Sequence, residues 1–97
     1  MKKNKKYKNS LPPNFQLKYD MILDFHGYSP EKALLELEEK IFCAMPQNSI
    51  LVVHGLGSGV LKNSIRDFIR CNKLVSHFEY GEETNLPGGA GVTLVYT

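Results

Sequence analysis

The chain has 97 residues, enough for one small domain with a single modest core. A hydrophobic content of 42 % excludes a disordered chain, and no stretch approaches the ~20 apolar residues of a membrane span. The net charge of +2 is uneven, because residues 1–18 hold six of the 12 basic residues and no acid, whereas the remainder holds six basic and ten acidic residues. A domain that is basic throughout is therefore excluded, and attraction to phosphate must come from the N-terminal segment or from a local patch.

Residues 1–18 are predicted to form a basic, flexible tail, since Lys and Asn dominate and Pro12 and Pro13 disfavour regular structure. The tail is either a solubility segment or an arm that contacts phosphate. A folded domain is predicted over residues 19–97. Residues 11–15 are too short and too polar for the apolar region of a secretory signal, so we expect a cytoplasmic protein, without a membrane partner, that is a monomer.

The folded part begins with two strands separated by a helix. Residues 21–25 are a short apolar run that predicts a strand. Ser29 is a suitable N-cap, Pro30 suits the first helical position, and Pro46 closes a helix whose apolar residues recur at helical spacing. Residues 49–53 are apolar on both faces, as in a central parallel strand.

The second half predicts one more helix and two more strands. A glycine-rich turn over residues 55–59 precedes a helix, and residues 74–80 and 91–96 are predicted strands joined by an irregular segment, residues 81–89. The helix has an apolar stripe of Leu61, Ile65, Phe68 and Ile69. The order βαβαββ predicts an α/β fold in two layers, with the helices packed on a sheet.

Three polar residues stand at the ends of the first two strands. Asp24 and His26 are two apart and project from one face, about 7 Å apart at Cα. His54 ends the second strand, and parallel strands place their carboxyl ends at one edge of the sheet. We therefore expect both histidines to reach one crevice with Asp24. Taken singly, Asp24 could only cap the next loop, and a lone histidine is more often structural.

Glycines and basic residues surround this expected crevice. Gly55, Gly57 and Gly59 precede a helix N-terminus whose free amides could hold phosphate, although a tight strand-to-helix turn explains them as well. Gly88 and Gly89 either form a flexible connection or leave room for a nucleotide chain. The helix carries a basic stripe that is a phosphate track or a solvated face: Lys62, Arg66, Arg70 and Lys73.

Three segments together resemble the Smr (small MutS-related) domain family. They are residues 23–27 (LDFHG), 54–62 (HGLGSGVLK) and 88–95 (GGAGVTLV), which match the family patterns LDLHG, HGxGxGxLR and GGxGVTxV over about residues 21–97. Phe25 replaces the usual Leu, and Lys62 replaces the usual Arg and so loses bidentate phosphate geometry. The resemblance identifies a stand-alone Smr domain.

This resemblance implies a mixed four-stranded sheet with two helices, similar to the C-terminal domain of bacterial translation initiation factor three. It also implies an endonuclease that acts on RNA or DNA, and family members include enzymes that cut mRNA at stalled ribosomes. The family's functional residues correspond to Asp24, His26 and His54.

We hypothesise an RNA endonuclease in which His26 and His54 are general base and acid and Asp24 orients one imidazole. No metal site and no other cofactor is predicted, and a divalent cation held by Asp24 and His26 is the mechanistic alternative. The alternative functions are a non-catalytic module that binds RNA or the ribosome, a protein-interaction domain, and a nuclease that nicks DNA.

Overall fold

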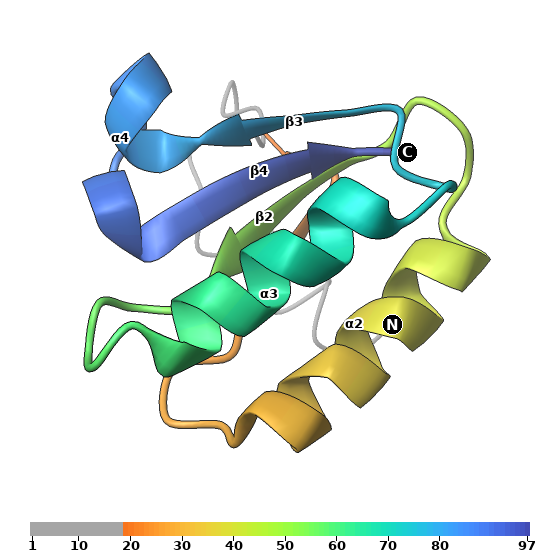
Figure 1. The fold of residues 1–97 in the computed structure, drawn as a ribbon. Coiled ribbons are helices and arrows are strands. Elements are labelled where there is room, and N and C mark those ends of the chain that lie inside the picture. Colours follow the sequence, from red (N-terminus) through yellow and green to blue (C-terminus); the bar gives the residue numbers. More distant parts are fainter. Residues whose placement is uncertain (1–18) are drawn as a thin grey trace, which may run out of the picture.

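The computed structural model describes residues 19–97, which form a four-stranded sheet covered on one face by two helices (Figure 1). The sheet order is β1-β2-β4-β3. Strand β1 (Met21–Asp24) is parallel to β2 (Ser49–Val53), whereas β4 (Val92–Tyr96) is antiparallel to both β2 and β3 (His77–Tyr80). The predicted α/β fold with a mixed sheet is confirmed, and the predicted tail over residues 1–18 lies outside the described residues.

Helix α2 (Pro30–Cys43) begins where the sequence predicts it. The Ser29 hydroxyl accepts a hydrogen bond from the Lys32 amide at 3.3 Å, and Pro30 occupies the first turn, where a missing N–H costs nothing. Ala33, Leu37 and Ile41 form its buried face. Neither α2 nor any other helix within residues 19–97 is long and apolar enough to cross a membrane.

Helix α3 (Val60–Cys71) lies beside α2 on the same face of the sheet (Figure 1). Ile65 and Ile69 of α3 are fully or almost fully buried against residues of the central strand, Ile50 and Val52 among them. Because the interior is close-packed, this layer between the helices and the sheet fixes where the ends of β1 and β2 lie.

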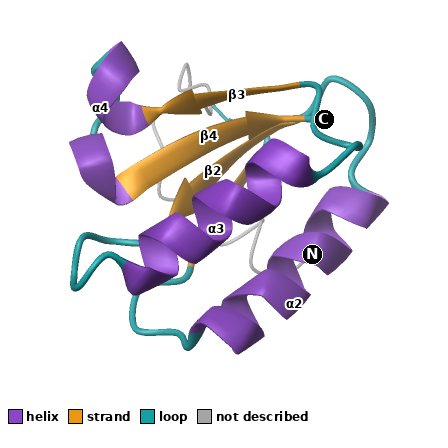
Figure 2. Ribbon diagram, viewed as in Figure 1, coloured by secondary structure: helices purple, strands orange, loops and turns teal. Residues whose placement is uncertain are grey.

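Two elements after α3 differ from the prediction. The strand predicted over 74–80 starts only at His77, because Asn72 holds residues 74 and 75 in a turn through hydrogen bonds to the Leu74 and Val75 amides. The segment predicted as irregular contains a short helix α4 (Gly81–Thr84) and a 3-10 turn η1 (Gly89–Gly91), drawn as separate helical turns in Figure 2.

The two turns pack closely enough that glycine is required at their contact. A β-carbon at Gly81 would collide with the carbonyl oxygen of Gly89 and with the Val92 side chain. The segment between β3 and β4 is therefore a compact part of the fold and not a loose connection.

We predict that Ile65→Ala lowers the free energy of unfolding by about 2–5 kcal/mol, because Ile65 is 0 % exposed and its removal leaves a cavity. Chemical denaturation measures the change. Leu35→Ala is the matched control, since Leu35 is 72 % exposed and should change stability by less than about 0.5 kcal/mol. Equal effects in the two variants would contradict the assignment of the buried face of α3.

Candidate active site at the ends of β1 and β2

A pocket lies at the carboxyl ends of the parallel strands β1 and β2. Its volume is about 450 Å³, and it is lined by residues 26–28, residues 54–59 and Leu61. His26 and His54 therefore reach one pocket, as the strand order predicts. A β-carbon at Gly55 would lie 3.6 Å from the β-carbon of His26, so the two loops that line the pocket are in contact.

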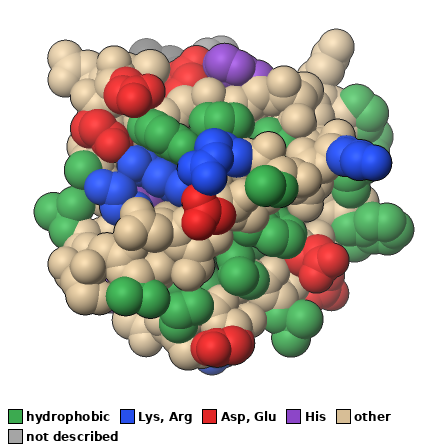
Figure 3. All heavy atoms as spheres, in the orientation of Figure 1, with side chains coloured by type: hydrophobic (Ala, Val, Ile, Leu, Met, Phe, Trp, Pro, Cys, Tyr) green, Lys and Arg blue, Asp and Glu red, His purple; other side chains and the backbone are tan. Residues whose placement is uncertain are grey.

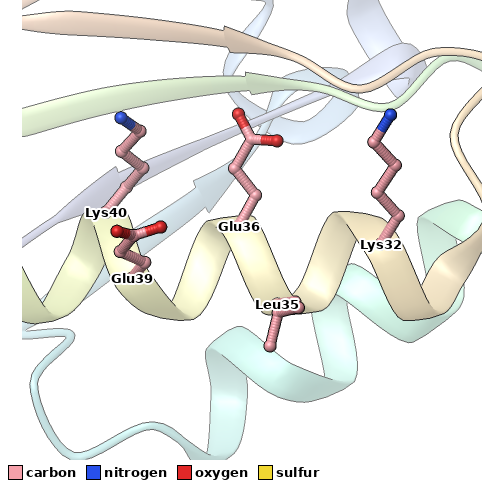
Figure 4. A pocket seen from close by; sticks show the side chains of 5 residues that line it. All are labelled: Lys32, Leu35, Glu36, Glu39 and Lys40. Carbon is pink, nitrogen blue, oxygen red and sulfur yellow. The ribbon is translucent and has the colours of Figure 1, made fainter.

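A second hollow, of about 290 Å³, lies on the outer face of α2 and has a different character. Figure 4 shows that its lining side chains all come from one helix, with Lys32, Glu36 and Lys40 in a row and Leu35 pointing away from that row. Lysine and glutamate four residues apart stabilise an exposed helix and need no ligand. This hollow is a solvated helix face.

Asp24 and His26 form a hydrogen-bonded pair at the pocket. Oδ1 of Asp24 lies 2.6 Å from Nδ1 of His26 and also accepts the His26 amide at 3.2 Å. A carboxylate can only accept, so the ring proton sits on Nδ1 and Nε2 is left as the free nitrogen. The bond raises the pKa of His26 above its ordinary value of 6.5 and lowers the pKa of Asp24 below 3.8.

His54 has a contrasting environment, although it too lines the pocket. It is 4 % exposed, its Nδ1 lies 3.0 Å from the Gly55 carbonyl oxygen, and its Nε2 lies 2.9 Å from Oγ1 of Thr93. The carbonyl can only accept, so Nδ1 carries the proton and Nε2 accepts from the Thr93 hydroxyl. Burial lowers the pKa of His54, which favours the neutral ring.

This geometry does not favour the sequence-based role of His54 in proton transfer, because both ring nitrogens are hydrogen-bonded inside the protein. Strand alternation explains the difference once the structure shows which face of β2 is covered. His54 follows Ile50 and Val52 at steps of two residues, so it shares their face, which is covered by the helices. His26 is two residues after Asp24 and shares its exposed face.

Arg66 is the clearest departure from the sequence prediction, which placed it on an exposed basic stripe. It is 6 % exposed and lies between α3 and the sheet. Its Nε donates to Thr93 Oγ1 at 2.8 Å, Nη2 donates to the Val92 carbonyl at 3.0 Å, and both terminal nitrogens donate to Glu82 at 2.8 Å. The guanidinium also lies 4.0 Å over the Tyr80 ring. Arg66 is therefore a buried structural cation. Its predicted place on an exposed stripe is wrong, and its burial does not favour the predicted contact with phosphate.

The partners of Arg66, Thr93 and Glu82, are supporting residues that the sequence analysis missed. The paired guanidinium lowers the pKa of Glu82 from 4.5 to about 2, so the carboxylate stays ionised. Thr93 is a polar residue inside an otherwise apolar strand, which was the available signal for a buried polar contact. Glu82 gave no such signal, since it lies in a segment predicted to be irregular.

The other basic residues of the predicted stripe are partly or fully exposed. Figure 3 shows lysine and arginine side chains on the helix-covered face of the domain. Arg70 donates to Asp67 at 2.6 Å, and Lys73 is exposed near the far end of the helix. Lys62 lies in the first turn, where its charge lowers the pKa of both His54 and Glu82. Of the stripe residues that are not buried, Lys62 is thus the one whose charge acts on the pocket residue His54.

The glycine loop presents backbone donors to the pocket. Gly55, Gly57 and Gly59 have φ values of 76°, 40° and 91°, which a residue with a β-carbon rarely adopts. Within residues 19–97 a set of amides at this loop and at the start of α3 has no hydrogen-bond acceptor: Gly57, Ser58, Leu61 and Lys62. Free amides at a helix N-terminus suit an anion such as phosphate.

Gly88 and Gly89 do not line the pocket. Their turn instead places the Gly91 carbonyl where it accepts the amides of both His54 and Gly55 at 3.0 Å. Gly88 and Gly89 thus support the glycine loop, and their place beside a nucleotide path stays a prediction.

Comparison with known proteins gives consistent matches. The family described as Smr domain matches residues 23–97. The chain is 36 % identical over 76 residues to "Endonuclease MutS2" of Ligilactobacillus salivarius and 36 % identical over 75 residues to the protein of that name from Streptococcus suis. These matches cover 76 % and 75 % of this chain but only 9 % of the length of each relative.

One solved structure is similar along nearly its whole length. The crystal structure of the Smr domain of Thermus thermophilus MutS2 superposes with a TM-score of 0.66 at 30 % sequence identity, over 78 % of this chain and 95 % of that one.

We predict that Arg66→Ala destabilises the fold by about 3 kcal/mol, because it leaves Thr93 and Val92 without their donor and Glu82 without its counter-charge. Thermal and chemical unfolding measure the change. Arg70→Ala is the control, since Arg70 is an exposed cation of the same helix and its loss should cost less than about 1 kcal/mol. Similar stabilities for both variants would show that Arg66 is not buried in solution.

We further predict opposite titration of the two histidines in NMR spectra of the imidazole groups. His26 should titrate above 6.5 and His54 below it, since a carboxylate stabilises the charged ring of His26 and burial disfavours that of His54. Asp24→Asn should move the pKa of His26 down towards 6.5 and leave His54 unchanged. A His54 pKa above that of His26 would contradict these environments.

Proposed function

This chain belongs to the Smr domain family, and from that premise we propose that it is an endonuclease that cleaves RNA at the Asp24–His26 pair. The observation that carries the proposal is the pair itself: Nδ1 of His26 is held 2.6 Å from Asp24, which leaves Nε2 free at a pocket bordered by unpaired amides. The activity in the name of the relatives, Endonuclease MutS2, supports the same reaction class.

His26 is proposed as the general base. Asp24 fixes the tautomer with the proton on Nδ1 and stabilises the imidazolium that forms when Nε2 takes up a second proton. A histidine whose pKa is raised above 6.5 is a stronger base than a free imidazole. Its exposed ring leaves space for a substrate beside Nε2, since the side chain is 74 % exposed.

The glycine loop is proposed to hold the scissile phosphate. The free amides of Gly57 and Ser58, with those that begin α3, can donate to non-bridging oxygens, and the positive end of the helix dipole favours the anion. Lys62, in the first turn, adds a full positive charge. Donors fixed by a folded backbone need no rearrangement as negative charge grows on the phosphorus oxygens.

The proposed step uses the ribose as the internal nucleophile. Nε2 of His26 removes the proton from the 2′-hydroxyl, the 2′-oxygen attacks phosphorus, and the bond from phosphorus to the 5′-oxygen breaks. The leaving oxygen takes a proton from water. The products are a 2′,3′-cyclic phosphate and a 5′-hydroxyl end.

His54 is proposed to position the loop. Its Nδ1 proton bonds the Gly55 carbonyl and its Nε2 is held by Thr93, so the ring fixes the first residue of the glycine loop relative to β4. This assignment replaces the acid role given to His54 on sequence grounds.

The donor set of the pocket favours acid–base chemistry over a bound zinc ion. Asp24 and His26 supply two ligands, and no group of three or more His, Cys, Asp or Glu side chains that could hold a metal occurs within residues 19–97. Two protein ligands are fewer than the three of a catalytic zinc site, whereas Mg²⁺ would need only a carboxylate together with the substrate phosphate.

We predict that His26→Gln lowers the rate of RNA cleavage by about 10²–10⁴-fold, the usual contribution of a general base, with little change in melting temperature because His26 is exposed. Asp24→Asn should also lose rate while keeping RNA affinity. His77→Gln is the matched control, since His77 is an exposed histidine that also lies near a carboxylate, that of Glu79. The assay follows an end-labelled RNA over time, both free and on stalled ribosomes.

The same assay distinguishes the alternatives. Cleavage should persist in chelator, yield 2′,3′-cyclic phosphate ends and fail on DNA of the same sequence. Loss of cutting in chelator together with 5′-phosphate products would reassign Asp24 and His26 as metal ligands. RNA binding without cleavage under all conditions would make the domain a binding module.

A further inference from the structure

Leu56 is a large apolar side chain exposed at the centre of the glycine loop. It is 62 % exposed and lines the same pocket as His26. Other large hydrophobic residues are exposed elsewhere on the surface, but Leu56 lines the pocket of the proposed base and directly precedes Gly57 and Ser58, whose amides are proposed phosphate donors. An apolar group at that place adds nothing to proton transfer or to phosphate binding, so it needs a separate account.

The loop holds Leu56 outward by its backbone. Gly55 and Gly57 on either side have positive φ values, and the Leu56 carbonyl accepts the Gly59 amide at 3.1 Å. The Gly55 amide is bonded to the Gly91 carbonyl at 3.0 Å. The exposed position of Leu56 is thus built into a hydrogen-bonded turn, so little conformational entropy is lost when a ligand packs on it.

Tyr28 supplies a second apolar surface at this pocket. Its amide bonds the Phe25 carbonyl at 2.9 Å, and its ring packs against the Phe25 ring with centroids 5.2 Å apart. The Lys32 ammonium lies 4.5 Å from the centroid of the Tyr28 ring. The ring is held in a fixed place at the pocket, half-buried, next to the loop that carries His26.

These surfaces match the one part of a nucleotide that the proposed function leaves unbound. If His26 contacts the ribose hydroxyl and the amides contact phosphate, the base is the remaining group, and its flat face is apolar. A side chain can pack on that face only when the base is not stacked in a duplex.

We propose that Leu56 and Tyr28 hold an unpaired base of the RNA next to the scissile phosphate, so that the domain acts on single-stranded RNA. This inference rests on the proposed function and deepens it. Leu56 is a specificity-determining residue in this account, and it takes no part in the proton transfer.

The test compares binding of wild type, Leu56→Ala and Leu35→Ala to short RNAs by fluorescence anisotropy. Leu35 is the matched control because it is an equally large exposed leucine on α2, away from this pocket. The RNAs are one single strand, the same strand in a duplex, and a series in which each position in turn lacks its base.

Leu56→Ala should weaken binding to the single strand about tenfold, the scale of one lost base contact, whereas Leu35→Ala should not. The loss should disappear for the strand that lacks the base at the cleaved position. Leu56→Met, which keeps an apolar side chain, should retain affinity, and unchanged melting temperatures establish that the variants are folded.

Equal affinities of Leu56→Ala and Leu35→Ala for the single strand would overturn the inference. Binding of wild type to the duplex as tightly as to the single strand would also overturn it, as would a loss of affinity in Leu56→Ala that is the same on every abasic strand. Cleavage separates the two proposals. Cutting by wild type with no effect of Leu56→Ala refutes only the base contact, whereas base-dependent binding without cutting refutes only the nuclease.

Discussion

Arg66 carries a full charge into the interior of the domain, and the geometry of the pocket depends on how that charge is satisfied. Its guanidinium joins three elements, since it bonds Thr93 and the Val92 carbonyl on β4 and pairs with Glu82 on α4 from its place on α3. Thr93 also hydrogen-bonds His54, and His54 in turn donates to the Gly55 carbonyl. A single series of hydrogen bonds thus runs from α4 through the interior to the glycine loop. An unpaired buried charge is costly, so the elements it joins are held in one arrangement.

The two pocket histidines lie in different environments, which is why we propose different roles for them. His26 stands past the end of β1, exposed and bonded to a carboxylate, so its charged form is favoured and one nitrogen is free. His54 continues the buried face of β2, where desolvation favours the neutral ring and both nitrogens have partners in the protein. Proton exchange with a substrate requires a free nitrogen, whereas fixing a loop requires the opposite. The proposed base and the proposed positioning residue follow from this difference.

Features that depend on neighbouring residues could be predicted from the sequence, and features that depend on distant partners could not. The start of α2 at Ser29 and Pro30 is local chemistry, and the meeting of His26 and His54 follows from parallel strand order. Helical spacing assigned Arg66 to the face of Lys62, but spacing does not say whether that face is covered. The Glu82 carboxylate, 16 residues away, pairs with Arg66 there, and it lies in a helix too short to have a periodic pattern. Helix α4 itself was missed because four residues are too few to show helical spacing.

The central claim is that His26, and not His54, exchanges the proton in RNA cleavage. The most direct test is the pH dependence of kcat/KM for RNA cleavage, set beside the pKa of His26 measured by NMR in the free protein. A general base must be neutral to act, so the rate should rise with pH and level off above the pKa of His26, which Asp24 raises above 6.5. Asp24→Asn should shift that inflection to lower pH. An inflection below 6.5 that follows the titration of His54 and does not move in Asp24→Asn would contradict the account.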